Sequence, residues 1–200
     1  MFGVGLSYRN RQIRVLPKNK LPRNGKFGFI SKMNIIFVGK MAEAKKKYST
    51  TITKKKAESK HDIVQLVVCV IIEDADTGKY LLMNRGDLLS IMVASHMDSY
   101  EYMYLQTAKR AIATKTNIDI DHDICFDPEF VGYAYDESAF GYGSHFGIVY
   151  RVKTKKDDVS CDKDQSVKCC DWVSADMDIE GLDPWSKMIM KSYCRSKFKE

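Results

Sequence analysis

Two carboxylates, Asp98 and Glu101, lie at the start of the best predicted helix of the chain, and their side chains could hold a divalent cation. Hard cations such as Mg²⁺ need anionic oxygen ligands, which Asp and Glu side chains supply. If the chain binds a metal ion, these two acids are the candidate ligands, because no other acid lies near that point. Two carboxylates are too few for the kind of metal cluster that catalyses hydrolysis.

Other polar and aromatic residues could contact a ligand, but each also has a structural explanation. Arg85 ends a predicted strand and could meet a phosphate, although exposed arginines at strand ends are common. His145 lies on a strand beside apolar residues, where a histidine is more often part of a satisfied core. A group of aromatic residues could stack a base, although alternating aromatics in strands are more often packing residues: Tyr133, Tyr135, Phe140, Tyr142 and Phe146.

The segments that must position these residues show strand and helix patterns in a definite order. Residues 64–73 form a β-branched run that predicts a strand buried on both faces. A turn at 76–78 leads to a returning strand at 79–85, and residues 88–94 form a third apolar stretch. The spacing of Tyr104, Ala108 and Ile112 predicts a helix over 100–116.

Three more strands and a closing helix complete the pattern. Strands are predicted at 130–135, 145–152 and Cys170–Val173. Asp183 is a suitable N-cap, and Pro184 then occupies the first position of a helix that carries Trp185 and Tyr193. The order β-β-β-α-β-β-β-α predicts an α/β fold in which one mixed sheet is flanked by helices, as in an α/β/α sandwich.

This order, together with the text of residues 92–118, resembles the Nudix hydrolases. Their motif is G-x5-E-x7-R-E-U-x-E-E-x-G-U, where U is aliphatic. Ser95, Glu101 and Arg110 fit the glycine, glutamate and arginine positions if one residue is inserted before Arg110. The segments 131–152 and 172–187 resemble later parts of one branch of the family, so that the resemblance covers about residues 63–195.

The resemblance implies a metal-dependent attack of water on a nucleoside diphosphate derivative, but the metal-binding residues of the motif are missing. Glutamates of the R-E-U-x-E-E turn hold the metal ions in that family. The corresponding positions here are Ala111, Thr114 and Lys115. Arg110 is therefore expected to lack its usual partners. Asp98 and Glu101 could still recruit a Mg²⁺ ion that arrives on a nucleotide.

The resemblance also implies roles for residues outside the motif helix. His96 follows the degenerate glycine loop, where the backbone is expected to approach a phosphate or simply to form a turn. Asp136 and Glu137 lie on a loop that supplies the general base in some Nudix enzymes, although acids on loops are usually only solvated. The candidate ligand-binding set is therefore Arg85, His96, Arg110, Asp136, His145 and Tyr142; the candidate catalytic acids are Asp98, Glu101 and Glu137.

The distribution of charge divides the chain into a basic segment and an acidic body. Residues 1–60 carry a net charge of +14, and residues 61–200 carry −8. The low hydrophobicity of residues 1–60 predicts a disordered arm, with residues 61–200 as the Nudix-like domain. Lysines of this arm could bind the phosphates of a nucleic acid, or the arm could be a solubilising tail. We hypothesise that Met41 is the true start and that residues 1–40 are translated leader sequence.

No apolar run reaches the roughly 18 residues that span a bilayer, and arginines interrupt the N-terminal segment where a signal peptide would be apolar. The six cysteines lack the spacing of a disulfide framework, which fits a reducing compartment and predicts a cytoplasmic protein. An enzyme fold that has lost its metal ligands and carries a basic arm would suit a phage or mobile-element protein.

Three functions follow from these observations. The first is a non-catalytic Nudix-like module that binds a nucleotide or a nucleotide-derived small molecule. The second is an active pyrophosphohydrolase that uses Mg²⁺ and relocated metal ligands drawn from Asp98, Glu101, Asp136 and Glu137. The third is a module that contacts nucleic acid or protein through residues 1–60.

Overall fold

The computed structural model describes residues 11–20, 28–31, 35–60, 62–85, 87–101, 103–125, 127–136, 143–161, 167 and 170–194. The elements that precede the predicted domain are β1 (Gln12–Pro17), a 3₁₀ turn (Lys18–Lys20), β2 (Gly28–Ser31), α1 (Ile35–Tyr48), β3 (Thr50–Thr53) and α2 (Lys54–Glu58). Those that follow are β4 (Ile63–Asp74), β5 (Tyr80–Arg85), β6 (Leu88–Ser90), β7 (Met92–His96), α3 (Tyr104–Lys115), β8 (Glu129–Asp136), β9 (Ser144–Thr154), β10 (Cys170–Val173) and α4 (Pro184–Ile189).

The ten strands of the described residues belong to one mixed sheet. The order along its main path is β10-β5-β4-β9-β8-β2, while β1 and β7 also pair with β4, β3 pairs with β1, and β6 pairs with β5. The pairing of β4 with β9 is parallel, and it extends from Val64 opposite Ser144 to Asp74 opposite Thr154. The other pairings are antiparallel, so the predicted mixed sheet is confirmed.

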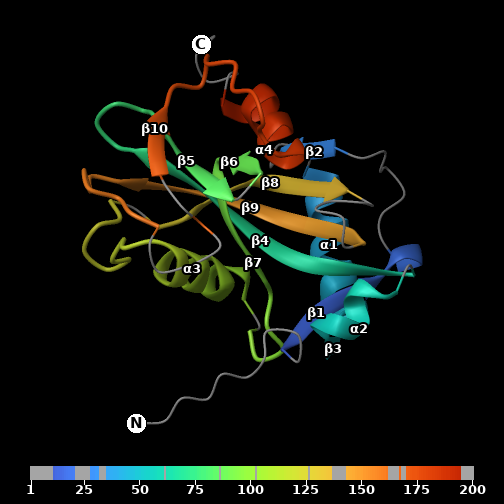
Figure 1. Cartoon of the computed structure of the whole chain (residues 1–200). Coiled ribbons are helices and arrows are strands. Elements are labelled where there is room, and N and C mark those ends of the chain that lie inside the picture. Colours follow the sequence, from blue (N-terminus) through green and yellow to red (C-terminus); the bar gives the residue numbers. More distant parts are fainter. Residues whose placement is uncertain are drawn as a thin grey trace.

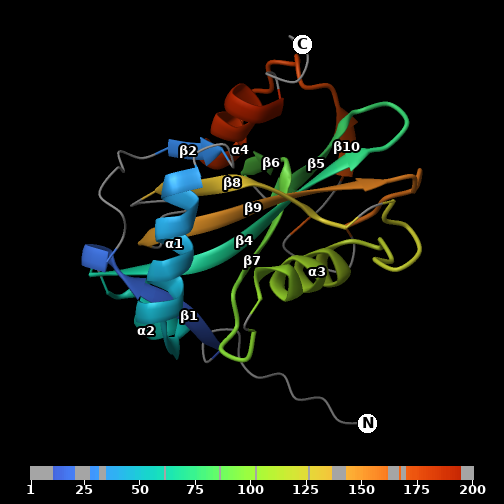
Figure 2. The ribbon, with the colours of Figure 1, turned by 180° about the vertical axis from the view of Figure 1, so that it is seen from behind.

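Helices cover both faces of this sheet, as the sequence predicts (Figures 1 and 2). On one face, α3 packs through Ala108 and Ile112 on residues of β4 that include Val68 and Val70. On the other face, α4 packs through Trp185 on a cluster that contains Cys69 and Ile71. Alternate residues of β4 therefore point to opposite helices, and the strand is buried on both faces, as its β-branched sequence predicts.

The closing helix begins where the sequence predicts but ends earlier. The Asp183 carboxylate accepts hydrogen bonds from the backbone N–H groups of Trp185 and Ser186, each at 3.0 Å, and Pro184 is the first helical residue. The α-helix ends at Ile189, and Tyr193 lies in a following π-helical turn, Met190–Cys194. A Cβ at Gly147 of β9 would lie 2.3 Å from the Trp185 ring, so the bare glycine backbone is what lets this ring reach the sheet.

The described residues of the N-terminal segment do not form the disordered arm that the sequence predicts. The β1 strand pairs with β3 and with β4, and its side chains Ile13, Val15 and Leu16 are completely buried. The apolar residues of β1 are few, but they lie on a strand that enters the sheet. Their burial stabilises the folded segment and offsets the conformational entropy that is lost when the segment becomes ordered. A chain that started at Met41 would lack this strand.

Two further observations concern the cysteines and the helices. Cys161 is disulfide-bonded, whereas Cys69, Cys125 and Cys194 are free thiols. The cysteine pattern therefore does not by itself indicate a reducing compartment.

Within the described ranges, no helix is long and apolar enough to cross a membrane.

Candidate functional site

The two candidate metal ligands lie in the loop between β7 and α3, where both side chains are buried. Asp98 and Glu101 are each 3% exposed. The helix begins at Tyr104 rather than near residue 100, and the extended residue Met103 precedes it. The loop therefore folds back over the start of the helix and directs Glu101 toward Thr107 and Arg110.

The Glu101 carboxylate is fully engaged by protein donors. It accepts hydrogen bonds from Arg110 Nε at 2.7 Å, Arg110 Nη2 at 3.0 Å, Thr107 Oγ1 at 2.6 Å and the backbone N–H of Asp98 at 2.8 Å. Burial by itself would raise the pKa of Glu101, but these hydrogen bonds outweigh it and hold the pKa below its ordinary value. Glu101 is therefore an ionised residue that the fold uses to hold Arg110.

Arg110 has several partners, although the motif glutamates that the resemblance implies as its partners are absent. Besides Glu101, its guanidinium donates to Ser95 Oγ and to the backbone carbonyl of His96, both at 2.8 Å. Its Nη2 also lies 3.4 Å from Asp98 Oδ2. In place of the lost glutamates of the motif, the retained Glu101 and the end of β7 orient the arginine.

Two arginines that the sequence did not identify as site residues complete this network. Arg11 contacts both carboxylate oxygens of Asp98 through Nε and Nη2. Arg14 donates from Nε to the carbonyl of Glu101 and from Nη2 to the carbonyl of Ser99, both at 2.8 Å. The sequence does contain a pattern that could have predicted this. Apolar and polar residues alternate at Ile13, Arg14 and Val15, which is typical of a strand whose arginine points away from the core.

We call the five charged residues Arg11, Arg14, Asp98, Glu101 and Arg110 the arginine–acid network. Its two carboxylates contact the guanidiniums of Arg11 and Arg110, while Arg14 binds backbone carbonyls of the same loop, so the carboxylate oxygens are already used by protein donors. Mg²⁺ would have to displace these donors in order to bind there. No group of three or more metal-ligating side chains occurs in the described part of the chain, and the residues of the network do not fit a divalent metal cluster.

The three motif positions on α3 lie outside this network. Ala111 is buried in the helix interface, and the exposed Thr114 donates its hydroxyl back to the carbonyl of Arg110 at 2.7 Å. Lys115 is the last residue of the helix. Its positive charge contributes, after burial and the charges of other groups, to the lowered pKa of His96. A cation is thus placed where the resemblance implies a metal ligand.

The two candidate histidines lie side by side on the opposite face from α3. The ring centroids of His96 and His145 are 5.5 Å apart. His96 Nε2 lies 3.0 Å from Gln65 Oε1, and His145 Nδ1 lies 3.0 Å from the carbonyl of Gly143. Burial is the main cause that lowers the pKa of both histidines, so both are neutral at pH 7. Sequence reasoning missed Gln65, whose partner lies 31 positions away.

Arg85 is the candidate with the most unusual surroundings. It ends β5, and the Nε and Nη2 atoms of its guanidinium are shielded from solvent without a hydrogen-bond partner in the described structure. Buried donors on a charged group are normally paired. This observation favours the ligand-binding interpretation of Arg85 over that of an ordinary exposed arginine.

The remaining predicted residues have less distinctive positions. Asp136 ends β8 opposite His145, and its charge slightly favours the protonated histidine. Tyr133 packs against Phe146 with ring centroids 5.0 Å apart, and both lie in the core, which supports the packing interpretation for this pair. Glu137 and Tyr142 lie outside the described residues.

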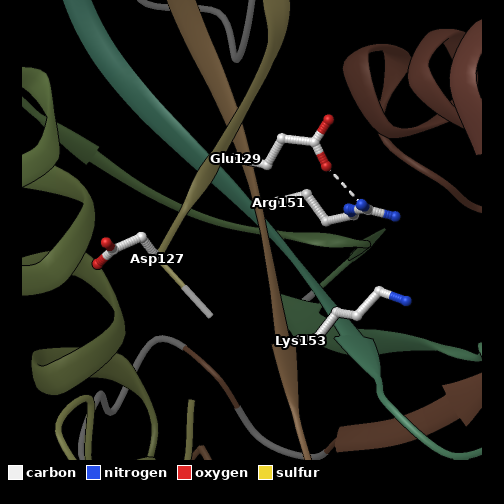
Figure 3. A pocket seen from close by; sticks show the side chains of 4 residues that line it. All are labelled: Asp127, Glu129, Arg151 and Lys153. Atoms are coloured by element: carbon white, nitrogen blue, oxygen red, sulfur yellow. Dashed lines mark hydrogen bonds and ion pairs between the residues drawn. The ribbon is translucent and has the colours of Figure 1, made fainter. Parts of the chain in front are cut away.

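A pocket of about 270 Å³ lies elsewhere, at the ends of β8 and β9, and is lined by Asp127, Glu129, Arg151 and Lys153 (Figure 3). Arg151 pairs with Glu129 and, at 3.0 Å, with Glu73, which also pairs with Lys153 at 3.0 Å. The basic side chains of the pocket therefore already have acidic partners. As a ligand-binding site, this pocket is a weaker candidate than the surroundings of Arg85.

No protein-family model matches the sequence, and no curated protein matches it. Several solved structures do match the fold. Tm1382, a candidate Nudix hydrolase, matches with a TM-score of 0.69 at 16% identity, over 92% of this chain and 99% of that one. The NUDIX domain of NrtR from Shewanella oneidensis, solved with ADP ribose, matches with a TM-score of 0.52 at 16% identity, over 68% and 88% of the two chains.

The dihydroneopterin triphosphate pyrophosphohydrolase of E. coli also matches, with a TM-score of 0.50 at 14% identity, over 66% of this chain and 98% of that one. Because the match to Tm1382 covers 92% of this chain, it extends into the segment 1–60. The chain therefore has the Nudix fold, as its degenerate motif and the predicted order of strands and helices imply.

Proposed function

We propose that this protein is a non-catalytic Nudix-fold module that binds a nucleotide or a nucleotide-derived small molecule. The observation that carries the proposal is the arginine–acid network. In it, the carboxylates nearest to the motif helix are bound by Arg11 and Arg110 instead of being open to a metal ion. Ligand binding needs a shaped site, whereas metal-assisted hydrolysis also needs free carboxylates.

The energetics of the network disfavour its use as a metal site. A divalent cation at Asp98 and Glu101 would have to separate them from Arg11 and Arg110, whose side chains are mostly buried. Breaking a buried ion pair leaves uncompensated charge and costs about 3–5 kcal/mol. The positive charge of Lys115 would add to the repulsion of a metal ion. Hydrolysis through relocated ligands would therefore depend on Asp136 and Glu137 without the support of the acids beside the helix.

The match to the NUDIX domain of NrtR supports a ligand of this class, since that domain was solved with ADP ribose. A fold alone does not fix a function, and the ligand is inferred from the shared fold together with the unpartnered donors of Arg85. We retain the cytoplasmic location as part of the proposal because nucleotides are abundant there.

A thermal-shift screen of the full chain tests the proposal. The panel contains nucleotides, dinucleotides and nucleotide sugars, each with EDTA, Mg²⁺ or Mn²⁺, and the same samples are analysed for products by mass spectrometry. A ligand that binds only the folded state raises Tm by mass action. We expect a shift in EDTA without product formation. Product formation that requires a metal ion would overturn the non-catalytic proposal and support the hydrolase.

The third interpretation, binding of nucleic acid, rests on the exposed lysines of α1 and α2. Lys46, Lys47, Lys55 and Lys56 point to solvent, whereas Arg11 and Arg14 are used within the protein. Deleting residues 1–60 is not a suitable test, because it would remove β1 from the sheet. Replacing the four lysines with glutamine is the better test, and loss of salt-dependent binding to a labelled duplex would support this alternative.

A further inference from the structure

Two large side chains of the loop between β7 and α3 face the solvent. Tyr100 is 66% exposed and Met103 is 60% exposed, whereas Glu101 between them is buried. Among the described residues, only Leu88 and Met177 are other large hydrophobic side chains with such exposure. Single exposed hydrophobic residues are common on protein surfaces, but two of them in one short loop form a candidate contact surface.

The backbone around Tyr100 is fixed, although the side chain of Tyr100 is exposed. The Arg14 guanidinium donates to the carbonyls of Ser99 and Glu101, the residues immediately before and after Tyr100, at 2.8 Å each. The backbone N–H of Ser99 also donates to the carbonyl of Gln12 at 3.2 Å. An aromatic side chain on a fixed loop has less conformational entropy to lose when it binds a partner. Tyr100 is therefore preorganised for contact.

Hydrogen bonds at the start of β1 bring α2 beside this loop. The carbonyl of Gln12 accepts from Ser99 of the loop, and the carbonyl of the preceding residue, Arg11, accepts from the backbone N–H of Lys54 at 2.8 Å. Lys54 is the first residue of α2. Figures 1 and 2 show the loop, the start of β1 and α2 at the same end of the molecule. Two consecutive carbonyls thus join the loop of Tyr100 to the start of α2.

The helix α2 carries positive charge that the protein does not neutralise. Lys55 and Lys56 are exposed, and neither has an acidic partner within the described ranges. Lys54 of the same helix pairs with Glu58 at 3.6 Å. The guanidiniums of the arginine–acid network are already used by acceptors of the protein. The two lysines are therefore the groups at this end of the molecule that can bind an anion from outside the protein.

We propose that the surface formed by Tyr100, Met103, Lys55 and Lys56, here called the Tyr100–lysine surface, binds a single-stranded nucleic acid. An unpaired base stacks on the ring of Tyr100 beside the apolar side chain of Met103, and the lysines of α2 bind backbone phosphates. A base inside a duplex cannot stack in this way, so the surface selects single strands. A protein partner fits less well, because lysine is depleted in protein–protein interfaces. This activity goes beyond the proposed binding of a small molecule and uses other residues.

The test measures binding of fluorescently labelled oligothymidine and oligouridine, each about 12 nucleotides long, to the full-length protein by fluorescence anisotropy. A labelled duplex of the same length is measured in parallel, and each titration is repeated at several salt concentrations. The variants are Tyr100→Ala, Tyr100→Phe and the double substitution Lys55→Gln/Lys56→Gln. The matched control is Lys187→Gln/Lys191→Gln, which removes the same charge from exposed positions at the C-terminal end of the fold. Circular dichroism and Tm verify that each variant is folded.

We expect the wild-type protein to bind the single strands more tightly than the duplex. Tyr100→Ala should weaken single-strand binding at least about fivefold, since the stacked ring is lost. Tyr100→Phe should bind as the wild type does, because it keeps the ring. The Lys55→Gln/Lys56→Gln variant should bind more weakly and with a smaller salt dependence, because fewer phosphates are neutralised. The control without Lys187 and Lys191 should bind as the wild type does.

Several results would overturn the inference. One is the absence of single-strand binding by the wild type, and another is unchanged binding by Tyr100→Ala. Equal affinity for the duplex would show that the lysines act without stacking. Competition by polyglutamate as effective as that by an unlabelled oligonucleotide would indicate a site for acidic proteins instead. If Tyr100→Ala loses mononucleotide binding as well, Tyr100 belongs to the small-molecule site, and the inference of a second surface fails while the proposed function stands.

Discussion

Arg110 binds Glu101 side-on, with Nε 2.7 Å from Oε1 and Nη2 3.0 Å from Oε2, and this pair joins the middle of α3 to the loop that precedes the helix. Arg110 also holds the end of β7 through Ser95 and the carbonyl of His96. Through these contacts, the two residues hold the helix to the sheet.

We expect Glu101→Gln to lower the free energy of unfolding by about 3 kcal/mol, because Arg110 loses its nearest counter-charge in a mostly buried network and keeps only the longer contact with Asp98. Urea denaturation monitored by circular dichroism measures this change. Glu129→Gln is the matched control: Glu129 also pairs with an arginine, but its side chain is 36% exposed, and its removal should cost less than about 1 kcal/mol. Equal effects of the two substitutions would show that the Glu101 pair is not a special structural link.

The stabilisation by Glu101 should depend on pH in a defined direction. Its hydrogen bonds to Arg110, Thr107 and the backbone hold the folded-state pKa below the ordinary value of 4.5, despite the opposing effect of burial. A carboxyl with a lowered folded-state pKa stabilises the fold above the unfolded-state pKa and loses this contribution as the pH falls through the folded-state pKa. The difference in stability between wild type and Glu101→Gln should therefore shrink below about pH 4.5. A difference that stays constant down to pH 3 would contradict this prediction.

The two histidines predict a second loss of stability at a higher pH. Burial lowers the pKa of His96 and His145 in the folded protein, while an unfolded histidine titrates near 6.5. The unfolded state then binds more protons, so stability should fall as the pH decreases from about 7.5 to about 5.5. Denaturant titrations at several pH values measure the slope. His96→Gln should reduce it, and His122→Gln, at an exposed position, should leave it unchanged.

Integration of β1 into the sheet can be tested by removing apolar contacts from that strand. Leu16 is fully buried, and Leu16→Ala should cost about 2–5 kcal/mol. Gln12 is exposed on the same strand, and Gln12→Ala should change stability by less than about 0.5 kcal/mol. A chain of residues 41–200 lacks β1 entirely and should unfold at a lower Tm than the full chain. Equal Tm values for the two chains would support the hypothesis that Met41 is the start of the folded protein.

The close contact between Gly147 and Trp185 predicts a strong interaction between β9 and α4. A methyl group at Gly147 would lie 2.3 Å from the Trp185 ring, so Gly147→Ala should lower stability by about 1–3 kcal/mol. A double-mutant cycle with Trp185→Leu provides the control. The cost of Gly147→Ala should be much smaller when the indole ring is absent. A cost that does not depend on residue 185 would exclude the steric explanation.

The sequence by itself determined the local elements and the class of the fold. The β-branched residues of β4 have no polar face, and this is enough to require burial on both sides. Asp183 and Pro184 define the start of α4 through a cap that involves only adjacent residues. The degenerate motif also identified α3 and the residues Glu101 and Arg110. Each of these features can be recognised from a short stretch of the sequence.

Only the tertiary structure decided how the charged residues are used. Arg11 reaches Asp98 across 87 positions, and Arg14 reaches the carbonyl of Glu101 across the same separation, because β1 enters the sheet beside β4. The low average hydrophobicity of the segment 1–60 predicted disorder. A strand as short as β1 adds little to the hydrophobicity averaged over sixty residues. The unpartnered edge of Arg85 likewise depends on what surrounds it in space. Sequence spacing determines which side chains are available, and strand pairing determines which of them meet.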